Sequence, residues 1–323
     1  MSLPSVFDPL RLPVVAAPLF IISNPDLLLA ECKAGIVGSF PALNARPIEL
    51  LDQWLTRINE ELDRYNQANP DTPAAPFAVN QIVHRTNERL MQDVELCVKH
   101  KVPIVITSLG ARPEVNDAIH SYGGITLHDV INNTFAKKAV EKGADGLIAV
   151  AAGAGGHAGT LSPFALVQEI REWFDGPLLL SGSIANGKSI LAAQAMGADL
   201  AYIGSPFIAT EEANAEDGYK RMIADCGSED IVYSNYFTGV WGNYLRPTLE
   251  ANGLDPDNLP SDGGLKMKFG EGESTKTKAW KDIWGSGQGI GAVKEVVPAA
   301  ERVADLARQY KNALAAMASV TAG

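Results

Sequence analysis

Short apolar runs rich in valine and isoleucine alternate along the chain with segments of helical period. The runs are continuously apolar, which is typical of parallel strands covered on both faces. Strands are therefore predicted at 14–19, 35–40, 77–82, 103–109, 124–127, 146–150, 177–181 and 200–204. Strands that alternate with helices in this way predict an α/β protein with a parallel sheet.

The segments between the runs predict the helices. The first begins after Asn24, an N-cap residue followed by Pro25, and ends before Gly35. A long polar helix is expected at 49–76, and further helices at 87–101, 112–121, 131–142, 161–174, 187–196 and 212–226. Eight βα repeats favour a (β/α)8 TIM barrel. A doubly wound sheet is the alternative, but its glycine-rich turn would normally follow the first strand.

Two segments exceed the βα repeat, the long helical segment 49–76 and the excursion after the eighth strand. Residues 231–290 follow the eighth strand and show little periodicity over much of their length, which is typical of a lid. An amphipathic helix follows within 291–323, where we expect it to pack on the barrel. The predicted organisation is a barrel (1–230), a lid-like excursion (231–290) and a C-terminal helix (291–323).

Composition narrows the class of protein. A chain of 323 residues that is 46% hydrophobic can bury a large core, and its net charge of −11 comes without a basic run. Nucleic acid and anionic membrane are therefore not expected as partners. Three separated cysteines indicate a reducing compartment and show no metal-ligand spacing, and no segment is a signal peptide or membrane span. We expect a cytoplasmic protein without a metal.

The loop after the sixth predicted strand carries the first candidate chemistry. Residues 153–159 read Gly-Ala-Gly-Gly-His-Ala-Gly. Glycines let the backbone approach a flat ligand closely, and His157 is placed to exchange a proton with that ligand. Taken alone, the pattern is more typical of an ordinary loop histidine beside turn glycines, and the other motifs of the chain reverse that reading.

The loops after the seventh and eighth strands predict a phosphate site. The pairs Gly182-Ser183 and Gly204-Ser205 each follow an apolar strand. Backbone amides in these two loops of a barrel commonly hold phosphate, although each loop alone could be a simple turn. Asn80, at the end of the third strand, offers an amide to the edge of a heterocycle.

These motifs together resemble the nitronate monooxygenase family. The resemblance runs from about residue 12 to 310 and rests on Pro13–Leu19, Asn80, the AGGHAG, SGSIANG and GSPFIATEE segments, Tyr219-Lys220 and the late Ile283–Gln288 segment. It implies an FMN-dependent TIM-barrel oxidoreductase. Such enzymes oxidise nitronates or nitroalkanes with O2 to a carbonyl compound and nitrite.

The resemblance also assigns roles to residues. His157 would be the catalytic base above the flavin ring. The cofactor would be bound by Ala17, Pro18, Leu19, Asn80, Gly155, Gly156, Gly182, Ser183, Gly204, Ser205, Gly287 and Gln288. Gly287 and Gln288 would bring the excursion back to the flavin.

The fifth strand departs from the family pattern. It ends in His128-Asp129, where related proteins can carry a lysine near the flavin. His128 is either the replacement cation or only a neighbour of a helix-capping Asp129. Phe20, His128 and Tyr244 are the candidate substrate contacts, although Tyr244 could instead only order the lid.

Two alternatives remain open. An NAD(P)H-dependent reductase of quinones or enoyl thioesters would use the same barrel, and flavin-dependent enoyl reductases also carry a GGH loop. A flavin-binding partner protein in a larger complex is the non-enzymatic alternative. The expected partners are a small-molecule substrate and O2, and a homo-oligomer is compatible with the sequence.

Overall fold

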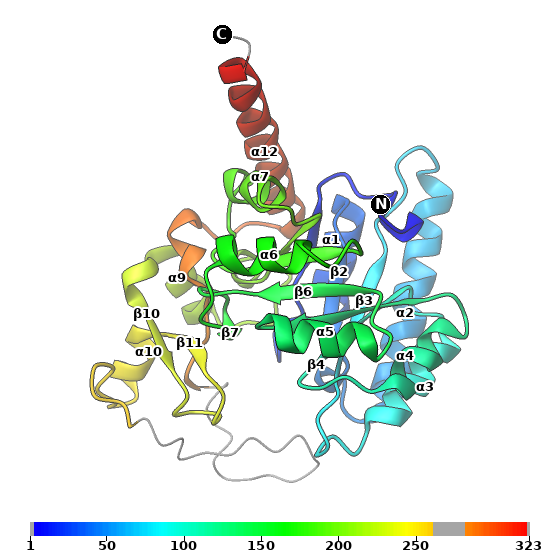
Figure 1. Ribbon diagram of the computed structural model, residues 1–323, viewed down its shortest axis with the longest axis horizontal. Helices are drawn as coiled ribbons and strands as arrows, with labels where there is room; N and C mark the ends of the chain where they lie inside the picture. Colours follow the sequence, from blue (N-terminus) through cyan, green and yellow to red (C-terminus); the bar gives the residue numbers. More distant parts are fainter. Residues whose placement is uncertain (1–2, 261–281, 322–323) are drawn as a thin grey trace.

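Eight parallel strands form a nearly closed barrel in the computed structural model, which describes residues 3–260 and 282–321. The barrel strands are β1 Val14–Ala16, β2 Gly38–Pro41, β3 Phe77–Ile82, β4 Ile104–Ser108, β5 Ile125–Val130, β6 Gly146–Val150, β8 Leu178–Ser181 and β9 Leu200–Ile203. Their order is β1-β9-β8-β6-β5-β4-β3-β2, and a parallel bridge between Val15 and Val37 joins the two ends (Figure 1). The predicted (β/α)8 barrel is confirmed.

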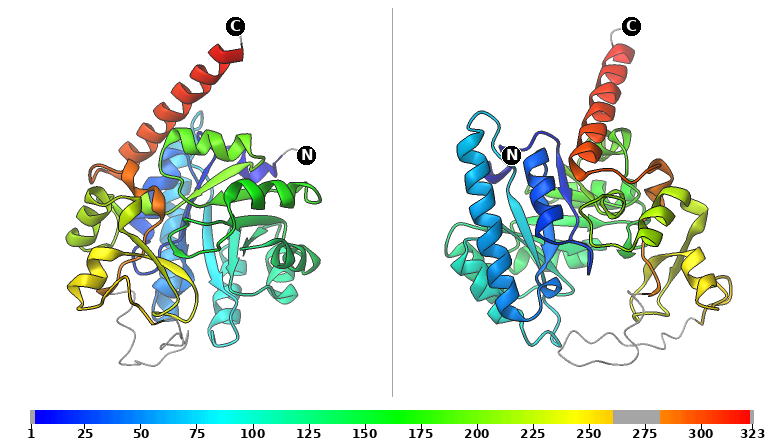
Figure 2. Two further views of the ribbon diagram at one scale, coloured as in Figure 1. Left: turned by 60° about the vertical axis from the view of Figure 1, so that its left-hand side comes forward. Right: turned by 180° about the vertical axis from the view of Figure 1, so that it is seen from behind.

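Helices follow the strands and cover the outside of the barrel (Figures 1 and 2). They are α1 Pro25–Ala34, α2 Ile48–Ala68, α3 Leu90–Lys99, α4 Pro113–His120, α5 Asn133–Glu141, α6 Pro163–Arg171, α7 Gly187–Ala195, α8 Ser205–Ile208 and α9 Asp217–Asp225. Each predicted helix is present, but the last begins at Asp217 rather than at 212. The long helix ends at Ala68, because Asn69-Pro70 cannot continue it.

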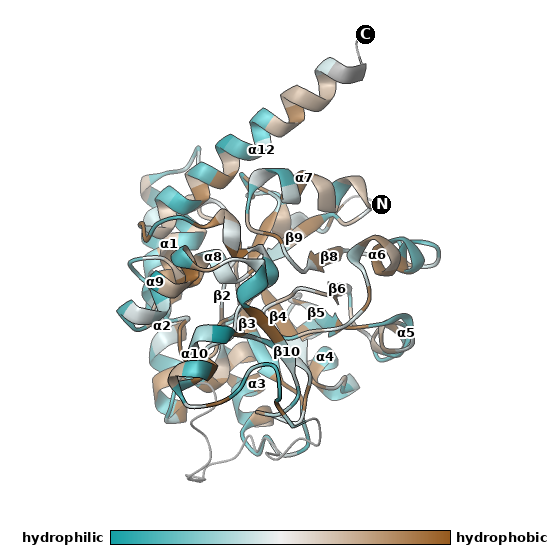
Figure 3. Ribbon diagram, turned by 90° about the vertical axis from the view of Figure 1, so that its left-hand side faces the viewer, coloured by the Kyte–Doolittle hydropathy of each residue, from teal (hydrophilic) through white to brown (hydrophobic). Residues whose placement is uncertain are grey.

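The strands separate two apolar layers. Ile104 and Ile106 of β4 point into the barrel interior, whereas Val105 between them packs under the helices. This alternation follows from the two-residue period of a strand and fills the barrel with side chains. Figure 3 shows the result as brown strands at the centre, with teal on the surrounding helices.

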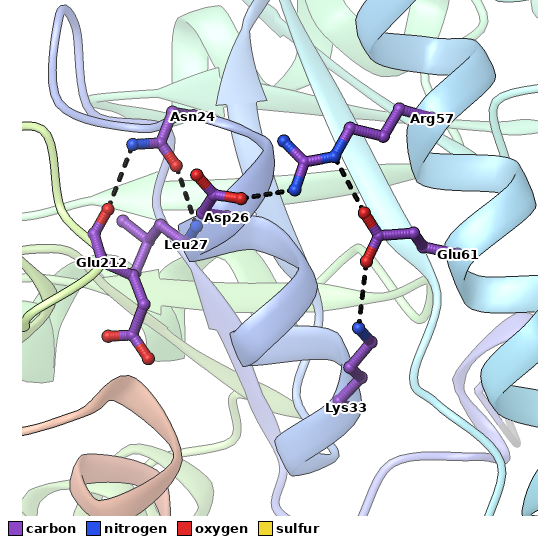
Figure 4. A network of polar contacts seen from close by, with 7 residues as sticks. All are labelled: Asn24, Asp26, Leu27, Lys33, Arg57, Glu61 and Glu212. Carbon is purple, nitrogen blue, oxygen red and sulfur yellow. Dashed lines mark hydrogen bonds and ion pairs between the residues drawn. The ribbon is translucent and has the colours of Figure 1, made fainter.

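The start of α1 is fixed as the sequence predicts. Asn24 Oδ1 accepts a hydrogen bond from Leu27 N at 2.9 Å, and Asn24 Nδ2 donates to the Glu212 carbonyl at 3.0 Å (Figure 4). Arg57 of α2 bridges Asp26 and Glu61, so that ion pairs tie α1 to α2. The cap therefore joins the beginning of the barrel to the segment that follows β9.

The excursion after the barrel contains more regular structure than its weak periodicity suggests. It forms β10 Ile231–Ser234, β11 Gly242–Leu245 and α10 Arg246–Ala251, drawn in yellow in Figures 1 and 2. Strand β11 pairs antiparallel with both β10 and β7 Gly156–His157, which makes a small second sheet. The predicted excursion also includes 261–281, which lie outside the described residues.

The chain returns to the barrel through the 3-10 helix η4 Gln288–Ala292 and ends in α12 Ala299–Thr321. Helix α12 packs against α1 and α7, and Gly187 permits the contact because a Cβ there would lie 2.0 Å from Tyr310 N. Later residues of α12 project from the body, and Met317 is 60% exposed (Figure 2). Only the first part of the predicted C-terminal helix therefore packs on the barrel.

Candidate active site

A cavity of about 2060 Å³ opens at the carboxyl ends of the barrel strands. This is the end of a TIM barrel at which active sites are built. The return segment before η4 and the excursion contribute walls of their own, through Trp284 and Gly287 and through Val240 and Trp241. The cavity thus brings together segments that are far apart in the sequence.

Four glycine-containing loops meet on one side of this cavity. We call them the four-loop cradle; they are residues 153–156, 182–184, 204–205 and 285–289. The carbonyl of Gly153 accepts from Ser183 N at 3.2 Å and from Gln288 N at 2.9 Å. The amide of Gly287 donates to Ser205 Oγ at 2.9 Å. These bonds hold the return segment against the loops after β6, β8 and β9.

Glycine is required where these loops touch. Gly153 has a φ of 82°, and a Cβ on it would lie 2.1 Å from Ser183 Oγ. A Cβ on Gly155 would lie 2.8 Å from Gly287 N, and one on Gly287 would lie 2.8 Å from the Gly153 carbonyl oxygen. Any side chain would push the loops apart, so the glycines that the sequence singled out are needed for close backbone approach.

The cradle presents backbone donors. Among the described residues, the amides of Ile184 and Gly204 have no protein acceptor, whereas the amide of Gly182 lies in the ladder that pairs Ser181 with Tyr202. Ser183, next to Ile184, has a φ of 55°, a left-handed conformation that a serine adopts at some cost. Amides grouped beside the start of α7 suit a phosphate group, because the helix dipole adds positive charge there.

His157 directly follows the first cradle loop and lies on the short strand β7. Its Nε2 is 3.1 Å from Thr238 Oγ1, and the Thr238 hydroxyl donates to the Val240 carbonyl at 3.0 Å. Because a hydroxyl has one proton, Thr238 must accept from Nε2–H, which leaves the lone pair on Nδ1. Burial lowers the pKa of His157 to about 4, so the imidazole is neutral at neutral pH.

A chain of hydrogen bonds crosses the cavity floor at the ends of β3, β4 and β5. Asn80 Nδ2 donates to Ser108 Oγ at 2.7 Å, and Ser108 Oγ donates to Asp129 Oδ2 at 2.5 Å. Burial raises the pKa of Asp129 to about 6, and within the described residues Asp129 Oδ1 is buried without a partner. The sequence flagged Asn80 but gave no reason to connect it with Asp129.

His128 lines the cavity floor as a neutral residue. Its Nδ1 lies 2.6 Å from Thr107 Oγ1, and burial lowers its pKa to about 4. The sequence left open whether His128 supplies the cation that the fifth strand otherwise lacks. Burial disfavours the protonated form of His128 that this role would require.

The other candidates differ in their surroundings. Ala17, Pro18 and Leu19 line the cavity just after β1, and Phe20 stands on its rim, 41% exposed. Gln288 is exposed; its backbone amide donates to the Gly153 carbonyl, and its side-chain Oε1 lies beside Gly153.

Tyr244 does not line the cavity. It is fully buried, and its ring packs on Phe237 with the centroids 4.7 Å apart. The hypothesis that Tyr244 contacts substrate is therefore replaced by the alternative, in which it orders the excursion.

Two aromatic residues of the cavity wall, Tyr219 and Trp284, belong to motifs of the sequence but were not assigned a role from it. Tyr219 of α9 stacks on Trp284 with ring centroids 4.8 Å apart and planes 6° apart. The Tyr219 hydroxyl also donates to the Gly285 carbonyl, next to the cradle. No local pattern predicts this stack, because Tyr219 and Trp284 come into contact only when the excursion folds back onto the barrel.

Two negative findings complete the description of the site. Within the described ranges, no group of three or more His, Cys, Asp or Glu side chains is arranged to hold a metal ion. In the same part of the chain, no helix has the length and apolarity that crossing a membrane requires.

A (β/α)8 barrel with a glycine-built cradle and a histidine at the carboxyl ends of its strands defines the class of TIM-barrel enzymes. The family model of nitronate monooxygenase matches residues 4–309, and the chain belongs to this family. It is accordingly an oxidoreductase, and the resemblance inferred from its motifs is confirmed.

Individual relatives are distant, and the three described next each cover more than nine tenths of this chain. A nitronate monooxygenase of Paraburkholderia phytofirmans is 24% identical over 94% of this chain and 93% of its own. Among solved structures, nitroalkane oxidase from Streptomyces ansochromogenes superposes with a TM-score of 0.81 at 24% identity, covering 97% and 100% of the two chains. FabK from Thermotoga maritima superposes with a TM-score of 0.76 at 21% identity, covering 99% and 100%. The two structures support the fold.

Proposed function

We propose that this protein is an FMN-dependent enzyme that oxidises alkyl nitronates with O2 to a carbonyl compound and nitrite. The observation that carries the proposal is the placement of a neutral, oriented histidine and a cradle of backbone amides in one cavity. Membership of the nitronate monooxygenase family supports the same reaction. The curated relative from Paraburkholderia carries that name as well.

The residues present fit FMN. Amides of Ile184 and Gly204 would hold its phosphate, and the glycines keep the four loops close enough together to form the cradle. Asn80 Nδ2 donates to Ile106 O and to Ser108 Oγ, so Asn80 has no amide proton left for the flavin ring. Its carbonyl oxygen would accept a hydrogen bond from an N–H of that ring. When bound, FMN supplies the one-electron redox chemistry and the reaction with O2.

His157 determines which form of the substrate is favoured. A pKa of about 4 makes its imidazole a weak base toward the carbon of a neutral nitroalkane. A nitronate is already an anion, and its charge next to His157 would raise the pKa of the imidazole and stabilise a protonated form. We therefore expect preformed nitronates to react better than neutral nitroalkanes.

The testing experiment uses the purified protein without oxygen. The chromophore is released and identified, and the protein is mixed separately with propyl-2-nitronate and with NADH. We expect FMN, one-electron reduction by the nitronate and no rapid reaction with NADH. Fast two-electron bleaching by NADH without a response to nitronate would replace the proposal by an NAD(P)H-dependent reductase.

A reductase of quinones or enoyl thioesters is the second candidate. The observation that favours it is the size of the cavity, since about 2060 Å³ exceeds the 300–1000 Å³ typical of ligand sites. Room beyond a flavin and a small nitronate would accept a larger substrate. The same anaerobic experiment separates the two candidates.

A further inference from the structure

One arm of the cavity runs between the loop after β4 and helix α5. Its two sides are joined at the far end, where Lys142 Nζ donates to the Ala111 carbonyl at 2.8 Å and Asn116 Nδ2 donates to the Lys142 carbonyl at 2.8 Å. The lining residues of this arm are Leu109, Gly110, Ala111, Ile131, Phe135 and Lys138. We call this space the α5 arm.

The α5 arm is apolar and its walls are exposed. Leu109 is 37%, Ile131 is 42% and Phe135 is 49% exposed, although all three are large hydrophobic residues. Burial of α5 in the core does not require this, because Ala136 and Ala139, rather than Phe135, are the α5 residues that pack into the barrel's hydrophobic core. Exposed apolar residues gathered in a concave space mark a binding site for an apolar group.

The outer part of the α5 arm carries positive charge. Lys138 and Lys142 follow Phe135 at intervals of three and four residues, which places all three on one face of α5. Lys142 is held by Ala111, whereas Lys138 is exposed in the cavity wall. In a chain of net charge −11, this cationic edge is suited to an anion.

We propose that the α5 arm binds a straight apolar chain of the substrate, and that Lys138 binds an anionic group at the end of that chain. This inference rests on the proposed function and names its substrate class: long-chain nitronates with an acidic end rather than small ones. The reacting group lies at the barrel mouth, and the apolar chain extends between Leu109 and Phe135.

The first test is a series of linear nitronates from ethyl to octyl. Each buried CH2 contributes about 0.8 kcal/mol, so kcat/KM should rise about fourfold per carbon until the arm is full. Phe135→Ser should flatten this rise and leave ethyl nitronate unaffected. Phe164→Ser is the matched control, because Phe164 is 63% exposed but does not line the cavity.

The charge is tested with an octyl nitronate that carries a terminal carboxylate. We expect kcat/KM to exceed that of the plain octyl compound several-fold, and Lys138→Glu should abolish the excess. Lys137→Glu is the control, because Lys137 lies over the Trp173 ring at 5.5 Å and not in the arm. Equal values for the two compounds would remove Lys138 from substrate binding.

Binding of decanoate, followed by calorimetry, tests the α5 arm without turnover. Weaker binding to Phe135→Ser and Lys138→Glu supports the inference even if no nitronate reacts, in which case only the proposed function fails. The inference is overturned, while the proposed function stands, if nitronates of all lengths react equally and decanoate binds both variants as tightly as it binds the parent protein.

Discussion

The imidazole of His157 is oriented by Thr238, a residue 81 positions later in the chain, through a contact of 3.1 Å between Nε2 and Oγ1. The contact exists because β11 of the excursion pairs with β7, which places Gly242 opposite His157. The excursion therefore positions the candidate catalytic residue of the barrel. It is part of the site rather than an appendage to it.

Thr238→Val should lower turnover without releasing the cofactor. The substitution removes the acceptor of Nε2–H, so the ring is no longer held in the tautomer with its lone pair on Nδ1. A lost hydrogen bond of about 1–1.5 kcal/mol corresponds to about a tenfold decrease in kcat/KM with propyl-2-nitronate. Steady-state kinetics and the FMN content of the purified variant measure both effects.

Thr238→Ser is the control, since it restores the hydroxyl but not the methyl group. Recovery of turnover and of the parent pH profile would assign the effect to the hydroxyl. Equal losses in the serine and valine variants would instead mean that Thr238 acts only through packing.

Gly153→Ala should expel the cofactor. The new Cβ would meet Ser183 Oγ at 2.1 Å and would sit at a φ of 82°, so the four-loop cradle must open. Gly123→Ala is a matched control, because Gly123 has a φ of 86° but nothing within 4 Å of its Cβ position. Both variants should lose about 1–2 kcal/mol of stability to backbone strain, and only Gly153→Ala should lose FMN.

A second substitution locates the clash. Ser183→Gly removes the Oγ that faces Gly153 and relieves the φ of 55° at position 183. Added to Gly153→Ala, it should restore part of the FMN content, as read from the absorbance ratio of the bound flavin to the protein. If the double variant is as empty as the single one, the cradle is disrupted by backbone strain alone.

Buried titratable groups on the cavity floor predict how stability changes with pH. His128 has a folded pKa of about 4, below the unfolded value near 6.5, so its contribution is present above pH 6.5 and is lost as the pH falls toward 4. Asp129 acts oppositely. Because its folded pKa is about 6, its contribution to stability is present below pH 4 and is lost as the pH rises through 6.

Denaturation across pH 4–7 checks both signs. Near pH 5, His128→Gln should make the rise of stability with pH shallower by about 1 kcal/mol per pH unit, and Asp129→Asn should make it steeper. Slopes that do not differ from the parent would mean that neither group has the shifted pKa that its burial implies.

Tyr219→Phe should weaken FMN binding through the return segment. The variant keeps the stack on Trp284 but leaves the Gly285 carbonyl without its donor, which costs about 1–2 kcal/mol. Tyr122→Phe is the control, because Tyr122 also donates to a carbonyl, that of Val102 at 2.7 Å, away from the cavity. Comparable losses of stability with a higher FMN dissociation constant only for Tyr219→Phe would support a role for the stack in the site.

Local patterns were sufficient for much of the barrel. The apolar run at 77–82 predicted β3 at its observed bounds, and Asn24 caps α1 as its residue type suggests. Glycines 153, 155 and 182 stood out in the sequence for the reason that the structure gives, which is the close approach of backbones. Such features depend on neighbours a few residues away, and the sequence displays them directly.

The hydropathy pattern and the motifs are enough to predict the (β/α)8 barrel, the glycine-rich loops and His157 within one of them. The folded chain is needed to show that Thr238 orients His157, that Asn80 connects to Asp129 and that Tyr244 is buried. The physical reason is that hydrogen bonding and desolvation act between groups that the folded chain brings together. Burial that shifts a pKa, or a hydroxyl that selects a tautomer, leaves no periodic mark in the sequence.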